Sequence, residues 1–495
     1  MPSTSLHDIK TLIASLHPLL AIETVEEERV RGLLATAGSE LGLPIFEWSV
    51  TSGLKRTDQP NAAHNTASPL GLMKHLATLR LAGIFHLKDF ASHLQDATVV
   101  RSVREAVQQF AKHRSTLVLT GDPIELPQVL TSHAVQFRLH LPNAEELRAA
   151  LATSLKSLKA RHRINVAIEP DDLERLVRAL RGLTLSQARQ AVSYAILEDR
   201  KLDADDITTI TERKARMLEE SGPIEYFPTE ENRFELGGFD KLKAWLERAS
   251  LGFGPKAAAL NLTPPRGVLI VGVQGCGKSL AAKVIARTWK LPLLKLDAGR
   301  LYDKFVGESE KNLRRATQLA ESMAPVVLWI DEIEKGLGAT GGSEADGGLS
   351  RRLVGSFLTW QQERKAEVFV VATANDLDVL PPEMLRKGRF DEIFFVDLPD
   401  AEERQAIVTI HLNLRNQDPE AFDLARLVAA TEGFSGAEIE QAVIAALYRA
   451  LHGERKLDTD LLLQELAETV PLSVSRREDI ARLRQRAKGR FVPVS

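Results

Sequence analysis

The chain has 495 residues, with 64 basic against 67 acidic side chains and a formal net charge of −3. At about 100 to 200 residues per domain, this length predicts three or four domains. A hydrophobic content of 44% with 26% charged residues is typical of a globular protein. The charge balance gives no sign of nucleic-acid binding, and no apolar run approaches the ~18 residues of a membrane span. The N-terminus lacks a secretory pattern and Cys276 is the only cysteine, so we expect a cytoplasmic protein without internal disulfides.

Residues 1–220 contain a pattern that returns about 250 residues later, in five pairs of segments that match in the same order. The pairs are Leu19–Trp48 with Val268–Leu296, Gly83–Leu94 with Val327–Leu337, Thr116–Pro127 with Val368–Pro381, Phe137–Leu151 with Phe394–Val408, and Arg181–Val192 with Glu432–Val443. General α/β composition does not explain five matches in one order. We therefore predict two copies of one α/β architecture.

The first copy lacks residues suited to phosphate chemistry. Where the second copy has a glycine-rich loop, Glu23–Glu28 contains four acids and no glycine, which would repel phosphate. Lys88 and Asp89 replace an acidic pair, and Asp122 replaces an asparagine. We expect no ATP binding in this copy. Asp89 and Asp122 could form a site of another kind, but surface or turn roles are favoured. Residues 201–228, which follow, are predicted to form a charged helical connection.

In the second copy, Gly272–Ser279 has the pattern G-x-x-x-x-G-K-[ST] of a phosphate-binding loop, between the predicted strand Gly267–Val271 and the predicted helix Leu280–Trp289. Glycines let consecutive backbone N–H groups surround phosphates at a helix N-terminus, where Lys278 adds positive charge and the Ser279 hydroxyl a ligand for Mg²⁺. The candidate ATP-binding residues of this segment are Gly272, Val273, Gln274, Gly275, Cys276, Gly277, Lys278, Ser279 and Leu280.

Two acids follow the apolar run Val326–Ile330, namely Asp331 and Glu332. At the carboxyl end of a parallel strand they would face the phosphate crevice, where Asp331 would hold magnesium and Glu332 would orient or activate water. The alternative is that they only cap the next helix. The predicted strand Val368–Ala372 is followed by Thr373, Ala374 and Asn375. At the end of this strand, Asn375 would contact the γ-phosphate or the water, although asparagine is also a common turn residue.

The loop Leu385–Glu392 carries Arg386 and Arg389. Two fixed cations suit stabilisation of charge on a transferring phosphoryl group. A solvated basic loop is the alternative interpretation.

Seven segments together resemble the AAA family of ATPases, in its own order and spacing. They are Gly237–Leu246, Pro264–Ser279, Phe305–Arg315, Leu328–Lys335, Ala372–Asp376, Leu385–Glu392 and Gly433–Val443. The resemblance implies an α/β fold with a P-loop NTPase core over residues 221–400, a helical lid over 401–464 and a tail over 465–495. Residues 1–220 would then be a degenerate AAA-like α/β domain.

The resemblance also implies ATP and Mg²⁺ as cofactors and an ATP-dependent homohexamer. Arg386 and Arg389 would then act as arginine fingers on the neighbouring subunit's ATP. An adenine pocket would lie near Gly238 and Phe239, with Gly436 and Ala437 of the lid close to the nucleotide.

Phe305 and Val306, with Gly307, match the pore loop that grips polypeptide in unfolding members of the family. A core role for Phe305 is the alternative. Gly336–Gly348 is predicted to be a second pore-facing loop or a disordered crossing.

Two positions depart from the family pattern. Lys387 stands where a proline is usual, and Cys276 where a threonine is usual. A thiol beside phosphates at a helix N-terminus would have a lowered pKa, which suggests a redox brake on nucleotide binding. A small buried side chain explains the position equally well.

The run Arg476–Arg490 has Ile480, Leu483 and Ala487 at helical spacing, which favours a docked amphipathic helix over a nucleic-acid patch. This tail and the paired layout resemble the AAA ATPases encoded in algal plastid genomes and cyanobacteria, which would place an algal member in the plastid stroma. We expect an ATP hydrolase that remodels a protein partner. A nucleotide-gated switch or scaffold is the alternative, whereas a zinc protease lacks its H-E-x-x-H motif and a helicase its basic surface.

Overall fold

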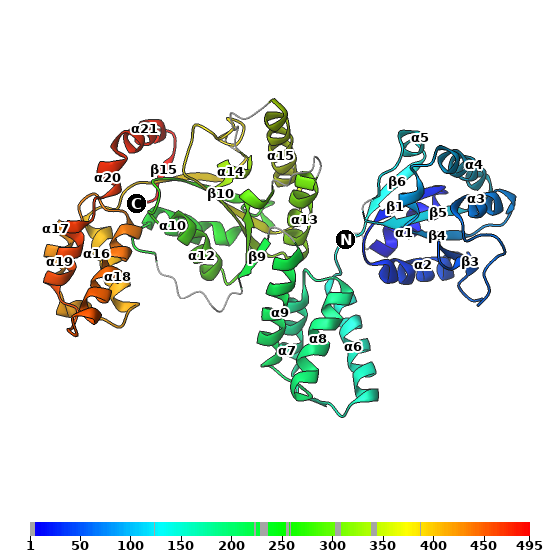
Figure 1. Ribbon diagram of the computed structural model, residues 1–495, viewed down its shortest axis with the longest axis horizontal. Helices are drawn as coiled ribbons and strands as arrows, with labels where there is room; N and C mark the ends of the chain where they lie inside the picture. Colours follow the sequence, from blue (N-terminus) through cyan, green and yellow to red (C-terminus); the bar gives the residue numbers. More distant parts are fainter. Residues whose placement is uncertain are drawn as a thin grey trace. The chain divides into compact units, whose positions relative to one another are not determined.

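The computed structural model describes residues 5–495 apart from 123, 222–223, 228–235, 254–256, 258, 302–307, 338–343 and 387. The chain divides into two compact units (Figure 1). The first comprises residues up to Asn165 together with Leu183–Arg200, and the second comprises Val166–Gly182 together with Lys201–Ser495. Among the described helices, none is both long enough and apolar enough to cross a membrane.

The first unit is built on a six-stranded sheet in the order β3-β2-β4-β5-β1-β6. The strands are β1 (Leu19–Glu23), β2 (Ile45–Ser49), β3 (Gly53–Arg56), β4 (Ile84–Lys88), β5 (Thr116–Gly121) and β6 (Ala134–Arg138). All of them pair in parallel except β3, which is antiparallel to β2. Short apolar runs such as Leu19–Ile22 are buried throughout, as expected for strands covered on both faces.

Helices cover both faces of this first sheet. Apolar side chains of α1 (Ser5–Ala14) and α2 (Glu27–Leu41) pack on one face. Those of α3 (Pro69–Thr78) and α4 (Ala97–His113) pack on the other. The unit also contains η1 (Phe90–His93), α5 (Gln128–Thr131), α6 (Ala144–Arg161) and α8 (Leu185–Asp199).

The second unit is built on a seven-stranded sheet in the order β15-β14-β10-β13-β12-β11-β9. Its strands are β9 (Ile224–Phe227), β10 (Gly267–Gly272), β11 (Leu293–Asp297), β12 (Val326–Asp331), β13 (Val368–Ala374), β14 (Glu392–Val396) and β15 (Val492–Pro493). Only β9 is antiparallel to its neighbour. On one face lie α10 (Asp240–Ser250), α12 (Lys278–Thr288) and α21 (Arg477–Ala487). Near β12, α13 (Glu308–Met323) packs against α15 (Glu344–Glu363).

The two sheets share one topology, which confirms the predicted repeat. The five parallel strands of the first run in the order β2-β4-β5-β1-β6. Apart from the short edge strand β15, the parallel strands of the second run in the order β11-β12-β13-β10-β14. In each copy the first strand in sequence lies between the fourth and the fifth. The strands thus correspond one to one, and so do the ends of the strands.

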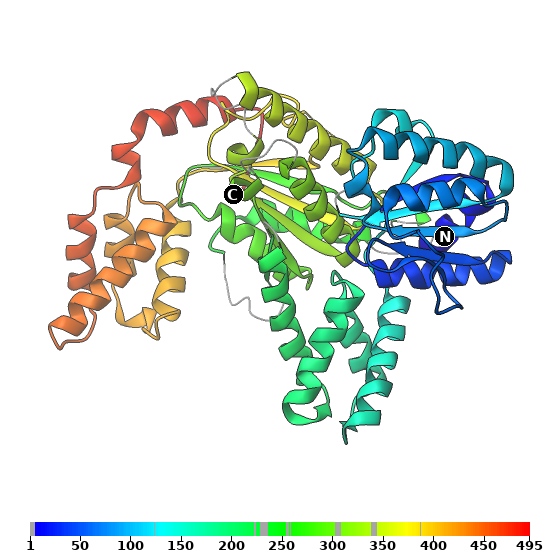
Figure 2. The ribbon, with the colours of Figure 1, turned by 45° about the vertical axis from the view of Figure 1, so that its right-hand side comes forward.

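Four helices form the lid, which lies at one end of the second unit (Figure 1). They are α16 (Ala401–Asn413), α17 (Leu424–Ala430), α18 (Gly436–His452) and α19 (Thr459–Glu468), and they share a core of their own. A segment with α20 (Leu472–Ser475), α21 and β15 then returns from the lid to the sheet, as the red ribbon in Figure 2 shows. Within it, Ile480 and Ala487 are buried and Leu483 packs against the core, so the predicted docked helix is confirmed.

Two predictions about connecting segments were wrong in part. Residues 201–228 are not only helical, because β9 follows α9 (Asp206–Ser221) and pairs antiparallel with β11. The second predicted loop is shorter than expected, since Glu344–Gly348 begins α15, and residues 338–343 lie outside the described part. The second unit also holds α7 (Pro170–Leu180), α14 (Ile333–Leu337), β8 (Lys201–Leu202) and the 3-10 turns Leu251–Phe253, Ala298–Leu301 and Pro419–Ala421. The two residues of β7 (Asn165–Val166) belong to different units.

Candidate nucleotide site

The loop Gly272–Ser279 connects β10 to α12, at the carboxyl end of β10, which lies between β13 and β14 in the second sheet. Gly275 and Gly277 have φ of 76° and 88°, a left-handed conformation that only glycine adopts at little cost. At Gly272, a Cβ would lie 1.9 Å from the carbonyl oxygen of Val396. The glycines of the pattern are therefore required by the shape of the backbone itself.

Lys278 begins α12 with its side chain under the loop. Its Nζ donates to the carbonyl oxygens of Gly272 (2.9 Å) and Val273 (2.7 Å). Burial lowers the pKa of Lys278 to about 8, an effect that Glu334, Asp331 and other nearby groups partly oppose. An ammonium that is poorly solvated and bound only to carbonyls gains most from an added anion. The phosphates of a nucleotide would supply that anion.

The neighbouring hydroxyl is in contact with the first acid of the pair. Ser279 Oγ donates to Asp331 Oδ1 at 3.0 Å, and Thr373 Oγ1 donates to the same oxygen at 2.6 Å. A hydroxyl and a carboxylate are oxygen ligands of the kind that Mg²⁺ prefers, and Mg²⁺ usually completes its shell with phosphate oxygens and water. The donor set therefore fits Mg²⁺, which Ser279 and Asp331 would hold.

Glu332 lies at the end of β12 in a left-handed conformation, with φ of 48°. Its N–H donates to Thr373 Oγ1 (3.1 Å), and its Oε1 accepts from Asn375 Nδ2 (3.0 Å). Lys335 forms an ion pair with the same carboxylate. The predicted pair of Glu332 and Asn375 is thus in direct contact.

Sequence reasoning missed Glu334. This side chain is buried, and its Oε1 accepts from the backbone N–H of Asn375 at 2.9 Å. Burial raises its pKa. Glu334 fixes the backbone of Asn375, whose amide in turn orients Glu332. The position of an acid two residues after Glu332 was the available signal.

Beside the loop lies a cavity of about 430 Å³ that reaches from Lys278, Asp331 and Asn375 to the first helix of the lid. This volume is in the range of small-molecule and cofactor sites. Its far end is lined by Gly237, Phe239, Ile407, Ile410, His411 and Leu414. Apolar walls of this kind suit an adenine ring, and the α16 residues among them were not predicted.

Gly238 is not among the residues that line this cavity, although both of its neighbours are. It has φ of 72°, and a Cβ there would lie 2.4 Å from Glu403 Oε1. Gly238 therefore allows the sharp turn that brings Phe239 to the cavity. His411 carries a pKa lowered mainly by burial, and its Nδ1 lies 3.7 Å from Glu440 Oε1.

The lid helix α18 touches the loop through its first turn. Ala437 N donates to the carbonyl oxygen of Gly275 at 3.0 Å, and Gly436 and Ala437 both line the cavity. Ser435 caps the helix in a reciprocal pair with Glu438. The lid start and the phosphate loop thus form one wall.

The two predicted arginines do not line this cavity. Arg386 is exposed and Arg389 is half-buried, in the segment between β13 and β14, and neither lines the cavity of its own chain. Phe305 and Val306 lie outside the described residues, as does Lys387.

Of the two interpretations of Cys276, the structure favours the small buried side chain. The side chain is 7% exposed, and burial raises its pKa to about 12 although Lys278 opposes the rise. Cys276 belongs to the apolar core cluster of the second unit, and this burial outweighs the effect of the helix N-terminus. The alternative of a small buried side chain describes this position, and the structure gives no support to a redox brake.

In the first unit, the position of Lys278 is taken by Arg29, at the start of α2. Its guanidinium donates to Glu26 Oε2 (3.1 Å), to both oxygens of Glu146 (3.0 and 3.1 Å) and to the carbonyl of His140 (2.6 Å). Only 4% of the Arg29 side chain and 9% of the Glu26 side chain are exposed. The other oxygen of Glu26 accepts from Leu185 N, at the start of α8, at 2.7 Å. The guanidinium of Arg29 is thus already bound to carboxylates of the same chain.

The first unit has Lys88 and Asp89 at the place where the second unit has the acidic pair Asp331 and Glu332. Lys88 Nζ lies 3.8 Å from Glu47 Oε2 and 4.0 Å from Glu27 Oε2. Asp89 keeps the left-handed backbone of Glu332, with φ of 53°. Asp122 follows Gly121, which lies beside Asp89. In the described parts of the chain, no group of three or more His, Cys, Asp and Glu side chains is arranged to hold a metal ion.

Four family models match the chain. Residues 268–398 match the ATPase family associated with various cellular activities (AAA), and residues 421–465 match the AAA+ lid domain. Residues 5–139 match the N-terminal domain of SpoVK-like AAA ATPases, and residues 145–221 match their second domain.

Relatives match over almost the whole length. The protein named "Uncharacterized AAA domain-containing protein ycf46" from Trieres chinensis is 36% identical, over 93% of this chain and 92% of its own length. Proteins of the same name from Guillardia theta and Pyropia yezoensis are 34% and 33% identical over 96% of this chain, and over 93% and 96% of their own lengths. A match of this extent covers both units, including the copy without a phosphate loop. The chain therefore belongs to the AAA ATPases, in the SpoVK-like group that these ycf46 proteins represent, and its AAA domain implies ATP binding.

Proposed function

We propose that the second unit hydrolyses ATP with Mg²⁺ and that the cycle remodels a protein partner. The observation that carries the proposal is the convergence of Lys278, the Ser279 and Asp331 pair, and the Glu332 and Asn375 pair on one cavity. These groups would bind phosphates, hold the metal and orient water, which are the tasks that phosphoryl transfer requires.

The residues have separate parts in the reaction. Lys278 would neutralise the phosphates, and Mg²⁺, when bound by Ser279 and Asp331, would supply charge stabilisation. Glu332 would accept a proton from the attacking water, with Asn375 and Glu334 fixing its position. For that step the Glu332 carboxylate must leave its ion pair with Lys335. Arg386 and Arg389 would act on the ATP of a neighbouring subunit in a homohexamer, which accounts for their distance from the cavity of their own chain.

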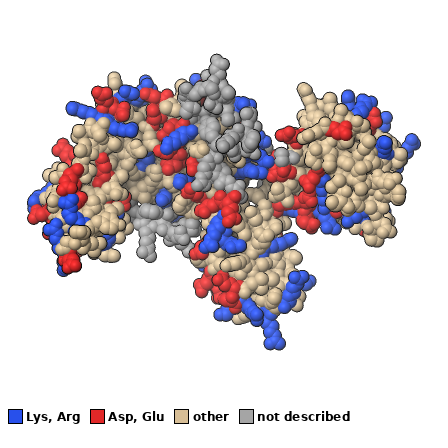
Figure 3. Space-filling model, in the orientation of Figure 1, with Lys and Arg blue, Asp and Glu red and all other residues tan. Residues whose placement is uncertain are grey.

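The first unit would recruit the partner or brace the assembly. Its loop supports a role without ATP, because Arg29 already has carboxylate partners within the same unit. We place the protein in the cytoplasm, or in the plastid stroma of an alga, and expect neither nucleic-acid binding nor a membrane span. The face drawn in Figure 3 carries Lys and Arg interspersed with Asp and Glu, and its described residues form no continuous basic stripe.

A nucleotide-gated switch or scaffold is the second candidate. The ion pair between Glu332 and Lys335 favours it, because a base that is engaged by a lysine favours slow turnover. In this case the ATP-bound state would recruit partners and hydrolysis would only reset it.

Steady-state ATPase assays on the full chain test the catalytic assignment. Lys278→Gln should abolish turnover, while Lys290→Gln, an exposed lysine past the end of α12, should not. Glu332→Gln should bind ATP and hydrolyse it at least about a hundredfold more slowly. Full activity in Glu332→Gln would refute the role of this residue.

Mixed assemblies test the shared site. An Arg386→Ala subunit should fail to activate a neighbouring subunit whose Glu332 is intact. As the fraction of Arg386→Ala subunits rises, the ATPase activity should therefore fall more steeply than the fraction of unmodified subunits does. Phe305→Ala separates the two candidate functions. Loss of biological output with intact ATPase supports threading, and unchanged output argues against threading and leaves the switch as the remaining candidate.

A further inference from the structure

Residues 471–495, which make up most of the tail, are attached to the lid at their first turn. Leu472 N donates to Glu438 Oε1 at 2.7 Å. The other oxygen of Glu438 accepts from the N–H and hydroxyl of Ser435, at 2.7 and 2.8 Å. Since Ala437 N binds Gly275 O in the phosphate loop, one carboxylate connects the tail to the wall of the nucleotide cavity.

The far end of the tail is attached to the large sheet. There β15 pairs in parallel with β14, and Val494 O accepts from Lys241 N at 2.9 Å. Between the two ends, α21 packs Ile480 into the core beneath the sheet. Arg484 Nε lies 2.8 Å from Asp397 Oδ2. The helix is therefore fixed relative to the loop, so its side chains have defined positions.

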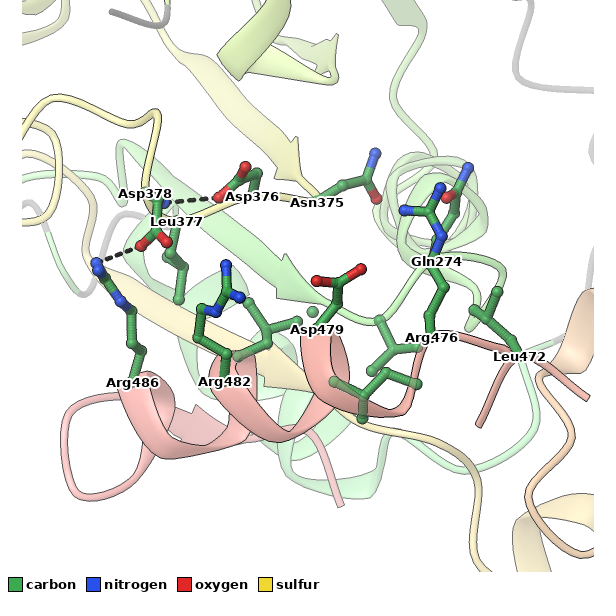
Figure 4. Close-up of a pocket in the computed structure, with 14 residues that line it drawn as sticks. Gln274, Asn375, Asp376, Leu377, Asp378, Leu472, Arg476, Asp479, Arg482 and Arg486 are labelled. Atoms are coloured by element: carbon green, nitrogen blue, oxygen red, sulfur yellow. Dashed lines mark hydrogen bonds and ion pairs between the residues drawn. The ribbon is translucent and has the colours of Figure 1, made fainter. Parts of the chain in front are cut away.

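Between α21 and the phosphate loop lies a second cavity, of about 260 Å³. Gln274 and Asn375 line this cavity (Figure 4) and also line the nucleotide cavity, so the two cavities share these residues as a wall. Asn375 is the residue that holds Glu332. The shared wall is therefore at the end of the site where the γ-phosphate and the attacking water would lie.

Three arginines of the tail line the second cavity, together with three aspartates. Arg486 forms an ion pair with Asp378, whose N–H is bound by the Asp376 carboxylate (Figure 4). Asp479 lies one turn after Arg476 and one turn before Arg482. Within the described residues, the guanidinium of Arg476 has no ion-pair partner. Figure 4 shows this side chain extending from the start of α21 toward Gln274.

We propose that Arg476 is a specificity-determining residue that favours ATP over ADP. When ATP is bound, its guanidinium would contact the γ-phosphate end of the nucleotide from the Gln274 side, within the same subunit. A guanidinium without an ion-pair partner near a third phosphate forms a charge-assisted hydrogen bond that a diphosphate lacks. This inference rests on the proposed ATP site, and it assigns to the tail a role that the seven family segments do not include.

Nucleotide titrations of the full chain test the proposal. Dissociation constants for MgATP and MgADP are measured by calorimetry in the Glu332→Gln background, which prevents turnover during the titration. Arg476→Ala should weaken ATP binding by about tenfold and change ADP binding by less than about twofold. Arg476→Lys keeps the charge and should lie between. Arg477→Ala is the matched control, because Arg477 is the adjacent exposed arginine and does not line the cavity.

The possible results distinguish a failure of the proposed role of Arg476 from a failure of the proposed ATP site. An unchanged ratio of ATP to ADP affinity in Arg476→Ala, or an equal loss for both nucleotides, overturns the role of Arg476 and leaves the site intact. A parent protein that binds neither nucleotide overturns the proposed function as well. An Arg477→Ala variant that behaves like Arg476→Ala shows that general charge, and not the position of Arg476, is responsible.

Discussion

Removing the Glu26 carboxylate should loosen the first unit, because this side chain performs two buried tasks. It pairs with Arg29, and it accepts the N–H of Leu185 at the start of α8. In Glu26→Ala both partners lose a contact in a region from which water is largely excluded. The affected elements are α2 and α8, which are far apart in sequence.

The expected cost can be worked from the contacts. Breaking a buried ion pair by removing one partner costs about 3 to 5 kcal/mol, but Arg29 keeps Glu146 and the carbonyl of His140, which places the ion-pair loss below that range. The orphaned N–H of Leu185 adds about 1 to 3 kcal/mol. We expect a total near 3 kcal/mol. Glu26→Gln keeps an acceptor for Leu185 and should cost about half as much.

Hydrogen exchange, measured by mass spectrometry on the full chain, shows which helices lose stability. In Glu26→Ala the amides of α2 and α8 should exchange faster, by the factor that corresponds to the lost free energy, while those of α12 and α18 should not change. Glu28→Ala is the control, since Glu28 is 82% exposed and lies 3.9 Å from Arg31, so its effect should stay within about 0.5 kcal/mol. Equal protection in the Glu26 and Glu28 variants would refute the reasoning.

The other predictions concern two buried titratable groups. Burial, aided by Lys88 and Arg31, lowers the pKa of His86 from 6.5 to about 3, so the unfolded chain binds a proton that the folded unit excludes. The free energy of unfolding should then fall as the pH decreases from 6.5 toward 3, by at most about 1.4 kcal/mol per pH unit. Urea titrations at several pH values should show that this free energy depends less on pH in His86→Gln than in the parent protein. The same pH dependence in both proteins would contradict the prediction. Cys276, with its pKa raised to about 12, should react with iodoacetamide at pH 8 at least about tenfold more slowly than an unfolded control, and rapid labelling of the folded protein would show that the thiol is accessible.

The ATPase half could be predicted from its sequence because its determinants are local. The glycines, Lys278 and Ser279 lie in one turn, and Asp331, Glu332 and Asn375 follow strands whose apolar runs are plain. Contacts made over long distances could not be predicted in this way. Arg29 and Glu146 are separated by 117 residues, and no pattern within either helix indicates the other.

The two edge strands of the second sheet were missed for a different reason. β9 has four residues and β15 has two, which is too short for periodicity to be read. The pKa of Cys276 could not be predicted from its place at a helix N-terminus. It is set mainly by burial, in a core cluster whose other members come from distant parts of the sequence.

The pairing of β15 with β14 has a consequence for biosynthesis. Lys241, two residues after the cavity-lining Phe239, donates through Nζ to the carbonyl of Ser495, 254 residues later. The wall near Phe239 therefore cannot be completed until almost the whole AAA half has left the ribosome. Contacts this distant in sequence are closed late, because a long loop must lose entropy before they form. A nascent chain can thus fold the first unit, where Arg29 already pairs with Glu26 and Glu146, before the wall near Phe239 is complete.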